Sequence, residues 1–206
     1  MAIKLIECTN DLPADAKFPN GMAAIDTETL GLNVLRDRLC VVQIGNGQGT
    51  VWLVKFDGTT YKAPNLKKLL ADKKITKIFH FARFDMATLF HWVGTMPAPV
   101  YCTKIASKLT RTYTDRHGLK SIVSELIGVD MDKSEQTSDW ASKLLTEAQK
   151  SYAASDVIYL HELKAELDAK LADRGRADMA EACFTFLATR AKLDLAGWDE
   201  QDIFAH

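Results

Sequence analysis

The chain has 206 residues, with 26 Lys and Arg against 27 Asp and Glu, which gives a formal net charge of −1. This length favours one compact domain, and a content of 47% hydrophobic and 26% charged residues excludes a disordered tail. The apolar stretches are too short to span a bilayer. Nonspecific binding to a long nucleic acid normally needs a basic domain, so with this near-neutral charge any nucleic-acid role must rest on a local patch or a bound metal.

The N-terminus and the cysteines predict a cellular location. The first residues lack the basic and long apolar regions of a secretory signal. The four cysteines are scattered with no CxxC spacing, which argues against a zinc ribbon or a disulfide framework. Both patterns predict a cytoplasmic protein with no membrane association.

The first half of the chain is rich in predicted strands. Four β-rich runs come first, at Ile3–Glu7, Met22–Thr27, Leu39–Ile44 and Val51–Phe56. After Pro64 the predicted elements alternate as a helix, a strand, a helix and a short strand, at Leu66–Ala71, Lys77–Phe81, Met86–Val93 and Val100–Cys102. Antiparallel strands followed by βαβ units predict an α/β fold, with helices on the faces of a mixed sheet.

The second half of the chain is mostly helical by pattern. Thr146-Glu147-Ala148-Gln149 fits a capping box, and the helix it starts has apolar spacing through Leu167 and an expected stop at Gly175. A further helix is expected from about residue 178 to about residue 195, followed by an acidic tail. We therefore divide the chain into a main domain, 1–175, and a C-terminal helix and tail, 176–206.

Acidic residues stand at three points of this pattern. Asp26 and Glu28 end an apolar strand, and a side-chain period of two places both carboxylates on one face. Asp85 lies among apolar residues at a strand-to-helix junction, where an unpaired carboxylate is costly. Tyr152 and Asp156 are four residues apart and so share one helical face.

Each acidic site alone also fits an ordinary structural role. Asp26 and Glu28 fit a solvated strand end. Asp85 fits an N-cap of the helix that begins at Met86. Tyr152 and Asp156 fit an exposed pair on an amphipathic helix.

In this order and spacing, the three sites resemble the exonuclease motifs of the DEDDy 3′–5′ exonucleases, and more specifically the RNase D family. Further matching segments are Gln43 in LCVVQIG, CTKIASKL, GLKSIVSELIGV, KSEQTSDW and LTEAQKSYAASDVIYL. The resemblance covers about residues 20–170. The chain ends at His206, without the helical nucleic-acid-binding repeats of full-length RNase D, and is most similar to the compact nanoRNase C, or oligoribonuclease-type, branch.

The resemblance implies an RNase H-like fold, with a mixed five-stranded sheet flanked by helices and a C-terminal helical extension. The implied activity is 3′–5′ hydrolysis of short oligoribonucleotides, dinucleotides included, to 5′-mononucleotides. Four converging carboxylates repel one another, so they make sense as ligands of two divalent ions, and oxygen ligands favour Mg²⁺ or Mn²⁺. The expected ligands are Asp26, Glu28, Asp85 and Asp156, while the resemblance makes Tyr152 the group that orients the attacking water.

Six residues are candidate substrate contacts. By resemblance, Thr29 and Leu30 hold the terminal nucleotide, and His80 matches a position that contacts substrate. Ordinary alternatives are a core leucine and a satisfied core histidine. Arg116 and His117 in TDRHG, and Lys133, are candidates for 5′-phosphate contact. A helical stripe of Lys104, Lys108 and Arg111 fits phosphate contacts or a solvated face equally well.

Two other functions are left open. One is an RNase D-like exonuclease that trims the 3′ ends of longer structured RNA, or DNA ends, with the same acids. The other is a non-catalytic nucleic-acid-binding domain, against which the intact acids count.

The expected partners are short RNA, with short DNA left open, and further copies of the chain. Phe184, Phe186 and Leu187 give the last helix an unusually large apolar surface, which predicts a homo-oligomer unless the helix completes the core of its own subunit. The family resemblance implies a ring-like homo-octamer.

Overall fold

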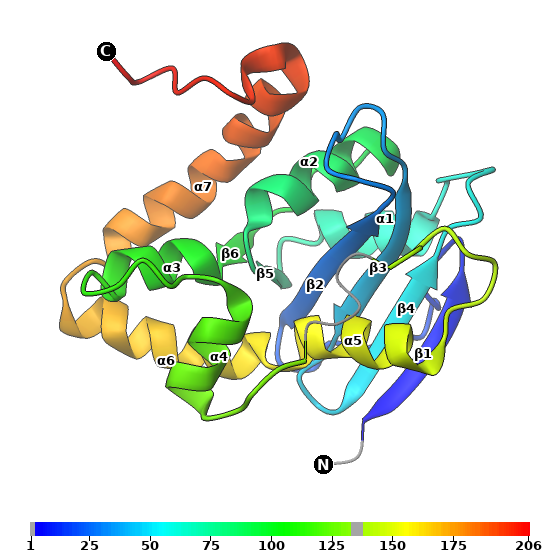
Figure 1. The fold of residues 1–206 in the computed structure, drawn as a ribbon, viewed down its shortest axis with the longest axis horizontal. Helices are drawn as coiled ribbons and strands as arrows, with labels where there is room; N and C mark the ends of the chain where they lie inside the picture. Colours follow the sequence, from blue (N-terminus) through cyan, green and yellow to red (C-terminus); the bar gives the residue numbers. More distant parts are fainter. Residues whose placement is uncertain (1–2, 133–137) are drawn as a thin grey trace.

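One mixed sheet of six strands forms the centre of the computed structural model, which describes residues 3–132 and 138–206 (Figure 1). The strand order is β1-β4-β3-β2-β5-β6. The strands are β1 (Lys4–Thr9), β2 (Met22–Thr29), β3 (Leu39–Gly45), β4 (Thr50–Lys55), β5 (Thr76–Phe79) and β6 (Val100–Cys102).

The α/β class and the mixed character of the sheet are confirmed, but the described sheet has six strands where five were predicted. β3 pairs antiparallel with β2 and β4, whereas β5 pairs parallel with β2 and β6 parallel with β5. All six runs predicted from the sequence form strands, and β1 pairs in parallel with β4 at the edge of the sheet, so the correction concerns only the count of five that the family resemblance implied.

The core lies on both faces of this sheet. All seven residues of β3 are buried, which explains its continuous apolar run, because a strand covered on both faces loses the polar-apolar alternation. Helix α5 (Glu147–Ile158) crosses the near face in Figure 1, and α1 (Pro64–Ala71) lies behind the sheet. Helix α2 (Ala82–Trp92) follows β5.

The helix predicted around Tyr152 is divided in two. α5 starts with the predicted capping box, in which Thr146 Oγ1 accepts from Gln149 N at 3.1 Å and Gln149 Oε1 accepts from Thr146 N at 2.8 Å. It ends at Ile158, and α6 (Leu160–Asp173) begins after Tyr159. The apolar spacing continues across this break, so periodicity alone does not reveal it. Gly175, with φ +61°, follows the end of α6.

Helix α7 (Ala177–Leu193) packs largely against its own subunit. Phe184 and Leu187 are buried, and the Phe184 ring lies 4.6 Å from the Tyr101 ring of β6. Arg83 of α2 donates to Asp194 Oδ2 at 2.6 Å, which ties the end of α7 to α2. Phe184 and Leu187 therefore complete the core of the same chain, whereas Phe186 stays 37% exposed.

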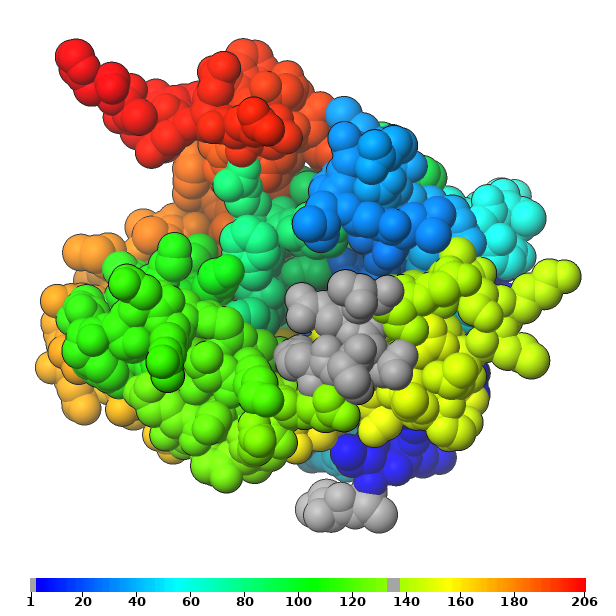
Figure 2. Space-filling view, viewed as in Figure 1, coloured from blue at the N-terminus to red at the C-terminus, as the bar shows by residue number. Residues whose placement is uncertain are grey.

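The remaining helices are α3 (Thr103–Thr110) and α4 (Leu119–Ile127), and a π-helical turn, η1 (Asp194–Trp198), follows α7. The tail after η1 extends away from the body of the molecule (Figure 2). Within the described parts of the chain, no helix has both the length and the apolar character for a bilayer crossing. The division of the chain at residue 175 stays a prediction.

Candidate active site

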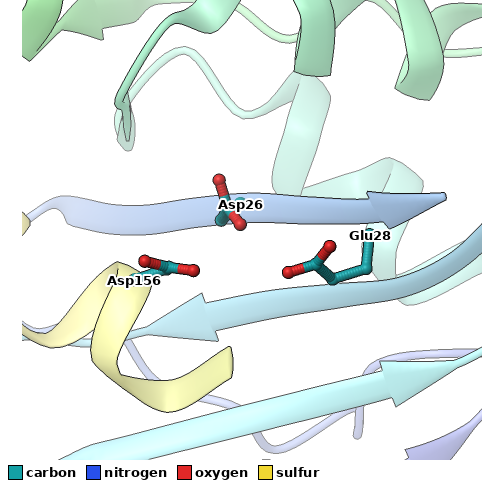
Figure 3. A group of neighbouring side chains, drawn as sticks. All are labelled: Asp26, Glu28 and Asp156. Carbon is teal, nitrogen blue, oxygen red and sulfur yellow. The ribbon is translucent and has the colours of Figure 1, made fainter. Parts of the chain in front are cut away.

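Three carboxylates meet where β2 passes α5 (Figure 3). Asp26 and Glu28 project from the same face of β2, because side chains alternate along a strand, and Asp156 projects from α5. One oxygen from each carboxylate lies within 4.8 Å of the others. The structure thus brings together three of the four predicted metal ligands, from two elements about 130 residues apart in the chain.

The fourth predicted ligand, Asp85, lies in α2 and is not part of this group of three. It is only 4% exposed, and its Oδ1 accepts a hydrogen bond from Thr27 Oγ1 at 2.6 Å. Burial raises the pKa of Asp85 to about 7, the Thr27 hydrogen bond opposes that effect, and the charge of Asp156 adds to it. The N-cap alternative for Asp85 is wrong, because α2 begins at Ala82 and its N-cap is Phe81.

Tyr152 and Asp156 lie side by side on the buried face of α5, at 8% and 6% exposure. Burial raises the pKa of the Tyr152 phenol, and the negative charges of Asp156, Glu28 and Asp26 raise it further. The phenol therefore keeps its proton at neutral pH and remains a hydrogen-bond donor. An exposed surface pair is excluded for these two residues.

Two residues that were not predicted as part of the site support the carboxylates. Gln43 of β3 lies opposite Asp26 in the strand register, is fully buried, and donates from Nε2 to Glu28 Oε1 at 3.4 Å. Thr27 points to the other face of β2 and holds Asp85. The alternation of β2 and the cross-strand register are the signals that identify them.

A loop after β2 carries Thr29 and Leu30. The register shifts between Glu28 and Thr29, and the Thr29 hydroxyl donates to Gly31 O. Asp37 braces the loop by accepting at Oδ2 from Asn33 N at 3.0 Å. A Cβ at Gly31 would stand 2.4 Å from Asp37 Oδ2, so a larger residue there would displace the Asp37 carboxylate.

Leu30 is 54% exposed, so the core-leucine alternative is wrong, and its contact with a nucleotide stays a prediction. His80 is half-buried, and its Nδ1 lies 2.9 Å from Thr103 Oγ1. The Thr103 hydroxyl donates its proton to Phe79 O, so His80 Nδ1 is the donor in this pair.

A cleft with a volume of about 740 Å³ opens over the carboxylates. Residues lining this cleft include Asp26, Glu28, Thr29, Leu30, Leu32, His80, Phe81, Lys104, Lys120, Ser138, Trp140, Tyr152 and Asp156. Seven of the predicted site residues thus share one cavity. Trp140 is buried beside Tyr152, with ring centroids 5.9 Å apart.

Two of the three predicted phosphate contacts, Arg116 and His117, lie outside the cleft lining. Arg116 is exposed and His117 half-buried in the loop before α4, and neither lines the cleft, although Gly118 and Lys120 next to them do. The His117 ring contacts Ser107 Oγ at 2.9 Å. Lys133 lies outside the described residues. Phosphate binding by these three residues stays a prediction.

The basic stripe on α3 is not uniform. Arg111 is buried, and its Nε donates to Glu125 Oε1 at 3.0 Å, so it is a structural ion pair and neither of the predicted alternatives holds for it. The Lys104 ammonium lies 4.1 Å from the centre of the Phe81 ring and lines the cleft.

A second hollow, the apolar groove, adjoins the cleft and has a volume of about 530 Å³. Its walls come from α3 and α7 and include Ile105, Met179, Cys183, Phe186 and Leu187, with Lys108 and Arg190 among the lining residues. Phe81 and Lys104 belong to both hollows.

The donor set of the cleft fits a hard divalent cation. Three carboxylate oxygens close together, with a fourth carboxyl buried in α2, repel one another unless a cation compensates their charge. The group contains neither a histidine nor a cysteine. Carboxylate oxygens suit Mg²⁺ or Mn²⁺, whereas zinc sites more often include histidine or cysteine.

Comparison with known proteins identifies the family of this chain. The 3′–5′ exonuclease family matches residues 9–172. Ribonuclease D of Acidiphilium cryptum is 34% identical over 176 residues, which are 84% of this chain and 44% of that protein. The chain thus spans less than half the length of this curated relative.

Solved structures of the Brucella melitensis protein NrnC are similar over the whole chain. NrnC bound to pGG is 60% identical, with a TM-score of 0.96 and coverage of 100% of both chains. NrnC with bound Mg²⁺ is 59% identical, with a TM-score of 0.95 and coverage of 99% of this chain and 100% of that one.

Proposed function

Since this chain belongs to the 3′–5′ exonuclease family, we propose that it is a metal-dependent exoribonuclease that degrades short oligoribonucleotides, dinucleotides included, to 5′-mononucleotides. The observation that carries the proposal is the grouping of Asp26, Glu28 and Asp156 beside Tyr152 in one open cleft. A non-catalytic binding domain would gain nothing from this mutual repulsion, so the cluster favours catalysis.

The metal ligands in this proposal are Asp26, Glu28, Asp85 and Asp156. Two divalent ions, Mg²⁺ or Mn²⁺, would stabilise the attacking and leaving oxygens of an in-line phosphoryl displacement. The Mg²⁺ in the NrnC structure supports divalent-metal use.

The chain's own groups orient the reactants. Tyr152 keeps its phenolic proton and donates a hydrogen bond that orients the attacking water. Gln43 holds the Glu28 carboxylate from the neighbouring strand, which limits the conformations that Glu28 can adopt. Leu30 and His80 line the cleft at positions where they contact the terminal nucleotide, with the His80 ring held through Nδ1 by Thr103.

A short substrate is favoured by two observations. The NrnC structure contains pGG, a short nucleotide ligand. This chain has a net charge of −1, whereas tracking along a long strand normally uses a positively charged groove. The digestion experiment described below distinguishes short RNA from short DNA and from longer structured RNA.

Self-association and a cytoplasmic location are parts of the same proposal. Several apolar side chains of α7 and the tail are exposed, namely Met179, Phe186, Trp198, Ile203 and Phe204. A stable interface buries at least about 1,000 Å², and these exposed apolar side chains would contribute to one. The proposed assembly is a ring-like homo-octamer, and light scattering measures its mass. The cysteines at 8, 40, 102 and 183 are free, as expected in a reducing compartment.

Digestion of 5′-labelled oligonucleotides tests the proposed function. RNAs from dinucleotides to about 20-mers, with matched DNAs, are incubated with Mg²⁺ or Mn²⁺ and with excess EDTA, beside the Asp85→Ala protein. We expect metal-dependent release of 5′-mononucleotides, fastest from the shortest RNAs. Full activity in EDTA would contradict the metal mechanism, and a preference for long RNA would favour the end-trimming alternative.

A further inference from the structure

The side chain of Gln149 joins the first turn of α5 to the segment Ser138–Trp140. Its Oε1 accepts the Thr146 amide proton in the capping box, and its Nε2 donates to Ser138 Oγ at 2.8 Å and to Asp139 O at 3.1 Å. Gln149 is 4% exposed, so these contacts are made away from solvent. The capping box uses only the Oε1 contact of this side chain, whereas the two Nε2 contacts connect the helix to a separate segment.

The segment tied by Gln149 packs on the Tyr152 ring. Trp140 follows Asp139 directly and is 2% exposed, with its indole 5.9 Å from the Tyr152 ring at an interplanar angle of 43°. Tyr152 lies three residues after Gln149, on the same side of α5. One side chain thus holds both the helix that carries the tyrosine and the indole that packs against it.

A second tether holds the chain just after the segment Ser138–Trp140. Lys55 at the end of β4 donates from Nζ to Lys143 O at 3.0 Å and also to Ser142 O. Trp140 therefore lies between two anchored points, Gln149 on one side and Lys55 on the other. Ser138 and Trp140 both line the cleft, so the position of this wall determines how the cleft meets Tyr152.

We propose that Gln149 is a positioning residue for the hydrolytic step, which holds Trp140 against Tyr152 and so fixes the direction of the phenolic hydroxyl. This inference rests on the proposed function, because it assigns to Gln149 the support of the water-orienting group. A small misdirection of a reacting group costs a large factor in rate, so loss of this support reduces turnover more than substrate binding.

Gln149→Glu separates the cap from the tether. A glutamate keeps the oxygen that accepts from Thr146 N, and Thr-x-x-Glu is a regular capping box. It removes the amide donor, leaves Asp139 O without its partner and places a carboxylate beside that carbonyl. We expect kcat on a dinucleotide to fall about tenfold, with KM changed less than about twofold.

Thr146→Ala is the matched control. It removes the hydroxyl that caps Gln149 N and leaves the two Nε2 contacts in place. We expect its melting temperature to fall by about 3 °C, with kcat unchanged. If both variants lower kcat in proportion to their loss of stability, Gln149 is only a helix cap and the inference is overturned.

The same substitution in a Tyr152→Phe background shows whether Gln149 acts through the phenol. We expect Gln149→Glu to cause no further loss of kcat there, because the group that it positions is already absent. An equal loss in both backgrounds would mean that the new charge acts directly on the acidic cluster, and would overturn the inference. Ser138→Ala, which adds no charge and removes one of the two Nε2 contacts, is the second variant, and we expect it to lower kcat about threefold in the wild-type background only.

The failure of this inference is distinguishable from that of the proposed function. A slow Tyr152→Phe protein together with wild-type kcat in both Gln149→Glu and Ser138→Ala overturns the positioning role alone. Wild-type kcat in Tyr152→Phe overturns the water-orienting role and this inference with it. If Gln149→Glu does not fold, as judged by circular dichroism, the result for Ser138→Ala decides.

Discussion

The cleft and the apolar groove are neighbouring hollows built on opposite principles. Phe81 and Lys104 line both, yet carboxylates line the floor of the cleft, whereas mostly apolar side chains of α3 and α7 line the groove. The acidic group forms where a strand end meets a helix. The groove forms where α7 packs beside α3 and leaves Met179 and Phe186 uncovered. Clustered charge indicates chemistry, while uncovered apolar surface indicates association.

The largest expected difference between the two hollows is in turnover. Asp26→Ala, Glu28→Ala, Asp85→Ala and Asp156→Ala should each lower the rate at least about a thousandfold, because each removes a ligand from a shared charge cluster. Met179→Ser in the groove is the matched control and should keep the rate of dinucleotide cleavage. Single-turnover rates measure both. If the Glu28→Ala protein were as fast as the Met179→Ser protein, the cleft would not be the site of catalysis.

Tyr152→Phe should lower kcat by about tenfold to about a thousandfold while leaving metal affinity unchanged, since it removes a hydroxyl and no ligand. Calorimetric titration with Mn²⁺ measures the affinity, and the turnover assay measures kcat. Loss of metal binding in this variant would place the phenol among the ligands.

Metal-free stability should depend on pH through Asp85. Its pKa is raised in the folded state, to about 7, so the protonated form stabilises the fold at low pH and this contribution is lost as pH rises through about 7. The free energy of unfolding in EDTA should fall by about 2 kcal/mol between about pH 5.5 and about pH 7.5.

Asp85→Asn is the control for this pH dependence. Every other titratable group is present in both proteins, so the difference between the two curves isolates Asp85. Urea titrations at each pH give the values. Parallel curves would show that Asp85 is ionised throughout this range.

A substitution in the apolar groove should have the smallest effect on turnover and the clearest effect on the mass of the assembly. Phe186→Asp places a charge in the exposed apolar surface and should lower the mass measured by light scattering, with dinucleotide turnover per subunit changed less than about twofold. If the assembly excludes long RNA by size, this variant should cleave longer RNAs relatively faster. An unchanged mass would place the interface elsewhere.

The sequence predicts the acidic site well because each part has a local signal. Asp26 and Glu28 follow from strand alternation, Tyr152 and Asp156 from helical spacing, and the capping box fixes the start of α5. The start of α2 is missed by four residues, because Phe81 adopts a left-handed backbone with φ 65° that no residue type there announces.

The role of a side chain that depends on a contact with a residue far away in the sequence cannot be predicted from local pattern. Arg111 looks like part of a basic stripe until Glu125 folds onto it, and Phe184 looks like interface until Tyr101 covers it. Gln43 supports Glu28 only through the register of β2 and β3. These roles depend on tertiary packing, which overrides local pattern.

The loop after β2 is braced from within by Asp37. Its carboxylate accepts from Asn33 N and lies close to Gly31, whose missing Cβ leaves room for it. Leu30 and Leu32 are presented on this loop, facing the same cavity as the ligands. If these leucines contact the nucleotide as proposed, exchanging them should change base preference while leaving the carboxylates in place, which makes the loop a target for engineering selectivity.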